Sequence, residues 1–193
     1  LNCAKKEGFT VRKASDEKIA DLLIQGKVVG RCVGRMEFGA RSLGNRSIIA
    51  DPRSSKIVQV INEKIKNRDF WMPFTPSILK EDFNKLIKNP KHLNSKFMLM
   101  AFHTTSLGQK NLGAAIHPSD FTARPQKLEK QDNPEYYNII KEFKKLTGVG
   151  ALLNTSLNLH GLPIARTVKD AFYIIDNSDL DCLIVENYLF IKK

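Results

Sequence analysis

A short segment of the chain concentrates residues that can bind an anion. The segment GRMEFGARSLGNRSII at positions 34–49 contains the arginines Arg35, Arg41 and Arg46 and the carboxylate Glu37. It also contains the glycines Gly34, Gly39 and Gly44. A guanidinium group presents a planar fork of donors to phosphate or carboxylate oxygens, and glycines bring backbone amides close to a ligand. The segment indicates an anion site, and a surface loop with solvated charges is the alternative.

Further polar segments lie where predicted helices or strands end. They are KNRD at 66–69, DFTARPQ at 120–126 and LNTSLN at 153–158. Open α/β sheets bind ligands at strand ends, and cations with hydroxyl and amide donors suit phosphates and a carbonyl group without metal ligands. We therefore predict nucleotide or acyl-phosphate chemistry. The sequence has no GxxxxGK[ST] motif, which argues against an ordinary P-loop ATPase.

The elements that would position these segments alternate along the chain. We predict helices at 16–25, 57–68, 134–147 and 168–175, with Ser15, Pro134 and Gly148 as end signals. Strands are predicted at 28–33, 47–50, 97–103, 151–153, 183–185 and 188–191, with weak alternation at 121–128. Residues 70–76 contain two prolines and should be irregular or lead into a strand, and residues 88–95 should be an exposed excursion. This pattern predicts one mixed α/β domain.

Composition narrows the class of protein. The chain has 193 residues, 42% of them hydrophobic, which suits one globular domain. Cys3, Cys32 and Cys182 form no CxxC pair, so we expect neither a disulfide framework nor a thiolate zinc site, and a reducing, cytoplasmic setting. No apolar run approaches the roughly 20 residues that span a bilayer, so no membrane partner is expected.

The net charge of +11 suggests either a nucleic-acid surface or a pocket for several phosphates. Many lysines stand beside acidic residues on the polar side of predicted helices, as in 63–66 and 141–145. That placement is typical of solubilising charge. We favour the phosphate pocket over nucleic acid.

Motifs in a fixed order make the prediction more specific. GRMEFGARSLGNRSIIADPR, KNRDFWMPFTPSIL, HPSDFTARPQ and LLNTSLNLHGLPI resemble the carboxy-terminal domain of the carbamoyltransferase family, which includes nodulation-factor and antibiotic O-carbamoyltransferases. The resemblance runs from about Lys27 to the end of the chain. It implies a YrdC/Sua5-like fold, a twisted mixed open sheet with flanking helices. It also implies a site for ATP and carbamoyl phosphate where a carbamoyl-adenylate forms.

The resemblance also implies a partner domain. Full-length members carry an amino-terminal Kae1-like domain with a histidine-bound metal, which transfers the carbamoyl group to an acceptor hydroxyl. We expect residues 1–193 to be one carboxy-terminal domain, with 1–26 as junction and first helix and 27–193 as the YrdC-like body. The histidines, His92, His103, His117 and His160, lack close metal-ligand spacing, so Mg²⁺ is expected to arrive with ATP and no metal to be bound by protein ligands.

Residue roles follow from the motifs. The predicted catalytic residues are Arg41, Lys66, Arg124 and Ser156. The predicted carbamoyl- and nucleotide-binding residues are Arg35, Arg46, Arg68, Thr122 and Asn154. The cations would hold phosphates, and an amide with a hydroxyl would orient the planar carbamoyl group. Alternatives stay open, since Lys66 could simply end a helix, Arg68 could pair with Asp69, and Arg35 and Arg46 could hold the loop together.

Met72 and Phe121 depart from the family pattern, because relatives commonly carry an arginine and a glycine there. Other functions also stay open at this point. They are YrdC/Sua5-like synthesis of threonylcarbamoyl-adenylate for tRNA modification, and a non-catalytic RNA-binding module.

Overall fold

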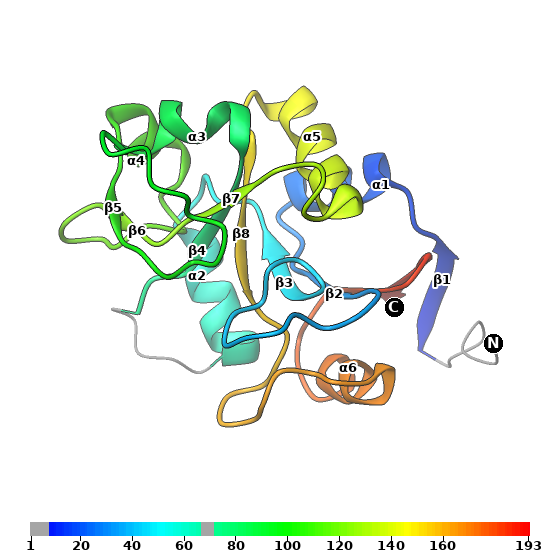
Figure 1. The fold of residues 1–193 in the computed structure, drawn as a ribbon. Coiled ribbons are helices and arrows are strands. Elements are labelled where there is room, and N and C mark those ends of the chain that lie inside the picture. The colour runs from blue at the N-terminus through cyan, green and yellow to red at the C-terminus, as the bar shows by residue number, and fades with distance from the viewer. Residues whose placement is uncertain (1–7, 67–71) are drawn as a thin grey trace.

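A sheet of eight strands runs through the described part of the chain, in the order β1-β10-β9-β2-β3-β8-β4-β7 (Figure 1). The structure is a computed structural model that describes residues 8–66 and 72–193. The strands are β1 Phe9–Lys13, β2 Val29–Cys32, β3 Arg46–Ala50, β4 Thr75–Leu79, β7 Gln126–Leu128, β8 Ala151–Ser156, β9 Cys182–Val185 and β10 Tyr188–Lys192. A separate two-stranded sheet joins β5 Phe102–His103 to β6 Thr122–Ala123.

The large sheet mixes parallel and antiparallel pairs. β2 pairs parallel to β9 and antiparallel to β3, while β4 pairs parallel to β7 and antiparallel to β8. β1 pairs antiparallel to β10, so a strand from the predicted junction forms one edge of the sheet. The predicted mixed sheet is confirmed.

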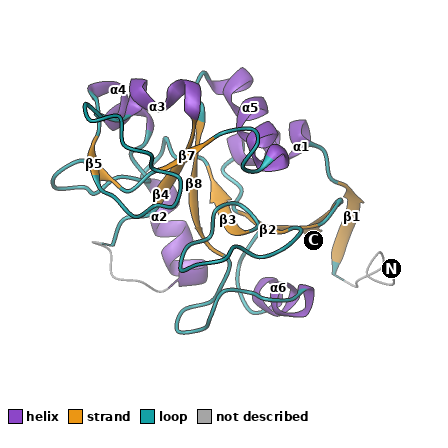
Figure 2. Ribbon diagram, viewed as in Figure 1, coloured by secondary structure: helices purple, strands orange, loops and turns teal. Residues whose placement is uncertain are grey.

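Helices cover both faces of the sheet, as predicted (Figures 1 and 2). Their bounds are α1 Asp16–Ile24, α2 Lys56–Ile61, the π-helix η2 Asn62–Lys66, α3 Lys80–Leu86, α4 Ser106–Asn111, α5 Pro134–Thr147 and α6 Val168–Asp176. α1 and α5 bury Leu23 and Phe143 in one core cluster, whereas α2 and α6 bury Ile61 and Ile175 in a second cluster. The sheet therefore separates two apolar cores.

Local signals set the ends of the helices. The Ser15 hydroxyl accepts from the amide of Lys18 at 3.3 Å at the start of α1. α5 begins at Pro134 and is followed by Gly148, whose φ of 77° lies in the left-handed region that glycine adopts without strain. These two predicted helices are confirmed.

Some predicted elements were wrong in extent. Of the residues predicted as a strand at 97–103, the structure forms a strand from Phe102–His103 alone, which is β5. The stretch 121–128, where weak alternation was noted, contains two strands, β6 and β7. β1, α3 and α4 were not predicted. The proline-marked segment does lead into a strand, β4, in which Pro76 precedes the residues that pair with β7. Because Pro76 lies outside the β4–β7 ladder, its missing amide removes no hydrogen bond between these two strands.

Candidate functional site

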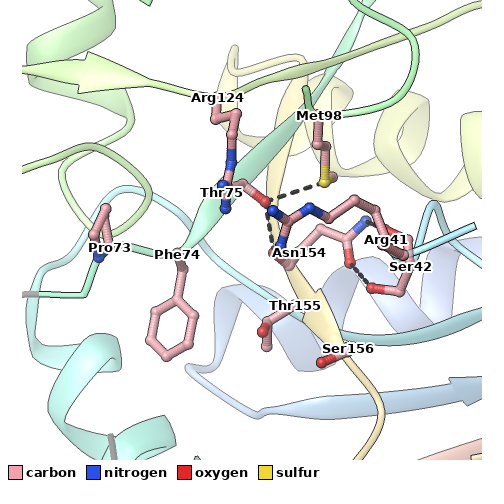
Figure 3. Close-up of a pocket in the computed structure, with 11 residues that line it drawn as sticks. Arg41, Ser42, Pro73, Phe74, Thr75, Met98, Arg124, Asn154, Thr155 and Ser156 are labelled. Carbon is pink, nitrogen blue, oxygen red and sulfur yellow. Dashed lines mark hydrogen bonds between the residues drawn. The ribbon is translucent and has the colours of Figure 1, made fainter. Parts of the chain in front are cut away.

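The sheet opens beside the carboxyl end of β8. β3 pairs with β8 as far as Ser156, whereas β4 pairs with β8 only as far as Asn154. Thr155 and Ser156 therefore extend past the start of β4, where the incoming chain contains Pro73 and offers no amide at that position. A cavity of about 70 Å³ occupies this opening (Figure 3).

Two arginines from distant parts of the chain meet at this cavity. Arg41 comes from the loop at 34–45 between β2 and β3, the arginine loop, and Arg124 comes from the link between β6 and β7. Both also line an adjoining cavity of about 550 Å³. Figure 3 shows both side chains beside Thr75 and Asn154. Two guanidinium groups at the boundary between two cavities can bind an anion that extends into both.

A buried hydrogen-bonded network fastens the arginine loop to the sheet. Asn154 Nδ2 donates to Ser77 Oγ at 3.0 Å and to the Ser42 carbonyl at 3.3 Å, and the Ser42 hydroxyl donates to Asn154 Oδ1 at 3.4 Å. Ser77 in turn donates to Gln126 Oε1 at 2.6 Å, and Gln126 Nε2 donates to the Leu43 carbonyl at 3.0 Å. Asn154 therefore fixes the floor of the small cavity with both ends of its amide.

The Glu37 carboxylate stabilises the arginine loop by accepting hydrogen bonds from backbone amides at the end of the loop. Its Oε1 accepts from the backbone amides of Leu43 and Asn45, each at 2.7 Å, and of Arg46 at 3.3 Å. We expected the glycines of this loop to turn backbone amides toward a ligand, and these three amides instead bind the loop's own carboxylate. These three amides are therefore occupied within the loop, and Arg41 is the cation that the loop brings to the cavities.

Two buried arginines support the loop and line neither cavity. Arg46 donates through Nη1 and Nη2 to the carbonyls of Val33 and Gly34, both at 2.9 Å. Arg31 pairs with Glu135 at 2.8 Å; burial lowers the pKa of its guanidinium, and the Glu135 carboxylate opposes that shift. Arg46 thus supports the loop and lines neither cavity, and its predicted ligand contact stays a prediction.

Lys66, at the end of η2, lies against the loop that follows β8. The side chain is buried, and its ammonium donates to the carbonyls of Ser156 at 2.5 Å and Asn158 at 3.0 Å, and to Asn158 Oδ1 at 2.6 Å. The Ser156 hydroxyl donates to the same Oδ1 at 2.6 Å. The structure brings the predicted catalytic residues Lys66 and Ser156 together, with Asn158 as a shared partner that sequence reasoning missed.

The remaining predicted residues are distributed as follows. Thr122 lines the larger cavity, and its hydroxyl donates to Asp120 Oδ1 at 2.7 Å. Arg35 is an exposed residue of the arginine loop and lines neither cavity. Arg68 lies outside the described residues.

The two departures from the family pattern have different settings. Met72 lines the larger cavity, where an arginine would add a further cation. Phe121 has a φ of 57°, in the left-handed region, where the glycine expected from the resemblance would lie without strain.

Thr155 and Met98 are among the residues of the small cavity that sequence reasoning missed. Thr155 is a mostly buried cavity-lining residue, and no hydrogen bond joins its hydroxyl to another described residue. Its position between Asn154 and Ser156, both predicted, was the available signal. Met98 also lines the cavity, and its Sδ accepts from Thr75 Oγ1 at 3.2 Å. No sequence pattern pointed to Met98.

Within residues 8–66 and 72–193, no group of three or more His, Cys, Asp or Glu side chains is arranged to hold a metal ion. No helix in the same part of the chain has the length and apolarity to cross a membrane.

Comparison with known proteins identifies the family. Residues 20–192 match the family described as carbamoyltransferase C-terminus. The chain belongs to this family. The chain is 43% identical over 92% of its length to an uncharacterized protein of Methanocaldococcus jannaschii, covering 29% of that protein. It is 40% identical over 90% of its length to the nodulation protein NolO of Bradyrhizobium diazoefficiens, covering 32% of it. A 3'-hydroxymethylcephem-O-carbamoyltransferase of Amycolatopsis lactamdurans is 29% identical over 92% of the domain, which covers 33% of that enzyme.

Solved structures show the same fold at low sequence identity. Full-length HypF superposes with a TM-score of 0.57 at 12% identity, with 95% of this chain and 22% of the HypF chain covered. Sua5 of P. abyssi superposes with a TM-score of 0.58 at 14% identity, with 90% and 50% covered. The predicted YrdC/Sua5-like fold is confirmed. The domain spans about a third of the length of the curated relatives that it matches.

Proposed function

We propose that the carbamoyltransferase domain binds ATP and carbamoyl phosphate and forms a carbamoyl-adenylate for transfer to an acceptor hydroxyl. Family membership supports a transferase, and the convergence of Arg41 and Arg124 at the boundary of two cavities supports the choice of substrates. ATP and carbamoyl phosphate together carry several negative charges. Two guanidinium groups offset the mutual repulsion of such anions and hold them in one orientation.

The sizes of the cavities suggest how the substrates are arranged. The smaller cavity, of about 70 Å³, suits the carbamoyl group, and the adjoining one, of about 550 Å³, suits a nucleotide. Arg41 and Arg124 would then lie at the phosphates between them. The Thr155 hydroxyl, which can donate and accept, lines the smaller cavity and would contact a carbamoyl oxygen or NH₂ bound there. Magnesium would arrive with ATP, bound to its phosphates.

The reaction balances as two steps. Water cleaves carbamoyl phosphate to carbamate and inorganic phosphate. A carbamate oxygen then forms a bond to the α-phosphorus of ATP, the bond to the bridging oxygen breaks, and pyrophosphate leaves with the electron pair. Arg41 and Arg124 would stabilise the charge that spreads over the phosphoryl oxygens during this displacement.

The product is a mixed anhydride, which water hydrolyses readily, so it should pass directly to the acceptor site. Because the relatives are about three times as long as this domain, we propose that their amino-terminal part, Kae1-like by resemblance, is the partner that completes the transfer.

Release of pyrophosphate tests the proposal. The chain is incubated with Mg-ATP, with and without carbamoyl phosphate, and compared with Arg41→Ala and Arg124→Ala. Lys56→Ala is the control, because Lys56 is an exposed cation at the start of α2 that lines neither cavity. We expect release that depends on carbamoyl phosphate and falls at least about 10-fold in the two variants, the cost of a lost charged hydrogen bond. Absence of both pyrophosphate release and calorimetric ATP binding would refute the proposal.

A further inference from the structure

One segment supplies a polar wall of the larger cavity. His117, Thr122 and Arg124, all from the motif HPSDFTARPQ, line the cavity of about 550 Å³. The His117 amide donates to the Thr122 carbonyl at 2.7 Å, and the Phe121 amide donates to the His117 carbonyl at 3.0 Å. Because the segment is folded tightly on itself, His117 keeps a fixed place beside the arginine that the proposed function assigns to the phosphates.

The loop also fixes one nitrogen of the His117 ring. Nδ1 accepts from the Ser119 amide at 3.3 Å and lies 3.3 Å from Asp120 Oδ1. Asp120 in turn accepts from the Thr122 amide at 2.8 Å and from the Thr122 hydroxyl at 2.7 Å, and these hydrogen bonds hold the pKa of its carboxyl below the ordinary value. The ring therefore has a backbone amide and a charged carboxylate beside Nδ1.

Both neighbours of Nδ1 favour a proton on the other ring nitrogen, Nε2. In the neutral ring Nδ1 accepts from Ser119, so the proton is on Nε2. In the charged ring both nitrogens carry a proton, and Nδ1 can donate to Asp120. No hydrogen bond joins Nε2 to another residue in the described part of the chain. His117 therefore offers Nε2–H to a ligand as a hydrogen-bond donor in either state.

A different segment gives the larger cavity an apolar wall. Residues 72–74, a methionine, a proline and a phenylalanine, line it just before β4 begins at Thr75. The base of a nucleotide suits such side chains, whereas phosphoryl oxygens need hydrogen-bond donors and positive charge. His117 lies on the polar wall with Arg124, so a phosphoryl group is the part of the nucleotide that its Nε2–H fits.

We propose that His117 binds the β- and γ-phosphoryl groups of ATP, which leave as pyrophosphate. This role rests on the proposed function and adds to it a residue that holds the leaving group. Arg41 and Arg124 line both cavities and would lie at the α-phosphoryl group, whereas His117 lines the larger cavity alone of these two. When the bond from the α-phosphorus to the bridging oxygen breaks, pyrophosphate takes the electron pair, and the Nε2–H donor stabilises this added charge.

Calorimetry with ATP and with parts of it tests the role of His117. The wild-type chain and its variants are titrated in the presence of Mg²⁺ with ATP, with inorganic pyrophosphate and with AMP. His117→Asn keeps an acceptor for the Ser119 amide but ends short of the position of Nε2. It should weaken the binding of ATP and pyrophosphate about 10-fold or more, the cost of a lost hydrogen bond to a charged group, and that of AMP less than about twofold.

Two further variants complete the experiment. His117→Gln carries an amide donor to the position of Nε2 and should recover most of the affinity for ATP and pyrophosphate. His103→Asn is the matched control, because His103 is an exposed histidine on β5, which pairs with β6 of the same motif, and it lines neither cavity. This variant should bind all three compounds as the wild type does.

The outcomes separate the role of His117 from the proposed function. Wild-type affinity for ATP and pyrophosphate in His117→Asn would overturn that role and leave the proposed function standing. Weaker AMP binding with unchanged pyrophosphate binding would overturn it too, because the ring would then contact the nucleoside or the α-phosphoryl group. Equal weakening of all three compounds in both His117 variants would show that the residue only shapes the loop. Failure of the wild-type chain to bind ATP would overturn the proposed function and the role of His117 with it.

Discussion

Gly44 lies directly against the ring of Tyr136, so close that a Cβ at Gly44 would overlap Tyr136 Cδ1. Gly44 also has a φ of 124°, which is open to glycine and strained for other residues. Tyr136 is fully buried on α5, and burial raises the pKa of its phenol. The contact packs one end of the arginine loop, which also carries Arg41, against the core.

Gly44→Ala tests this contact. The added methyl would meet an immobile ring and would also impose an unfavourable φ, so we expect a loss of about 2–4 kcal/mol in the free energy of unfolding. Gly39→Ala is the matched control, because Gly39 has a φ of 134° in the same loop and nothing within 4 Å of a new Cβ. Urea denaturation should show a smaller loss for Gly39→Ala, of about 1–2 kcal/mol. Equal losses of unfolding free energy in the two variants would mean that the Tyr136 ring moves aside to accommodate the added methyl group.

Glu37 is expected to matter for binding as well as for stability. Glu37→Ala would leave the three amides of Leu43, Asn45 and Arg46 without the acceptor that the structure shows, and we expect a cost of about 1–3 kcal/mol in unfolding free energy. Because the loop also carries Arg41, ATP affinity measured by calorimetry should fall. Glu37→Gln keeps an amide oxygen as acceptor and should lose less of both. Unchanged ATP affinity in Glu37→Ala would show that the loop does not depend on this carboxylate.

Much of the fold was predictable because local chemistry determines it. α5 begins and ends where Pro134 and Gly148 predict, and the spacing of its apolar residues matches its buried face. β1 was missed because the five residues Phe9–Lys13 are a strand through pairing with β10, at the other end of the sequence. No local pattern encodes that partner.

The candidate site divides in the same way. Residue type and motif indicated Arg41 and Arg124, and the fold brings them to one cavity. In contrast, Arg46 donates to the carbonyls of Val33 and Gly34, whose positions are set by the tertiary structure and not by a local sequence pattern. Sequence shows that a residue is able to donate hydrogen bonds, and tertiary structure decides which acceptors take them.

Lys66→Met should reveal how far the loop after β8 depends on a buried ammonium. Methionine matches the length of the side chain but donates no hydrogen bond, so the acceptors on Ser156 and Asn158 would lose their donor. We expect a loss of about 2–3 kcal/mol in the free energy of unfolding, measured by urea denaturation. Lys56→Met, at the exposed start of α2, is the control and should change stability by less than about 0.5 kcal/mol. A similarly small effect for Lys66→Met would argue that water replaces the ammonium.

Asp82 should make stability depend on pH in the acid range. Burial by itself raises the pKa of this carboxyl, but hydrogen bonds from Lys144 and Lys85 outweigh burial and hold the pKa below its ordinary value. A carboxyl with a lowered folded-state pKa stabilises the protein above the unfolded-state pKa of about 3.9, and the contribution is lost as the pH falls through the folded-state pKa.

Asp82→Asn should therefore be less stable than wild type by about 1–3 kcal/mol at pH 7, and the difference should shrink below about pH 4. Chemical denaturation at pH 7, 5, 4 and 3 measures this difference, with Asp21→Asn on the exposed side of α1 as the control. A difference that stays constant from pH 7 to pH 3 would show that the Asp82 charge contributes nothing and that the substitution acts through packing alone.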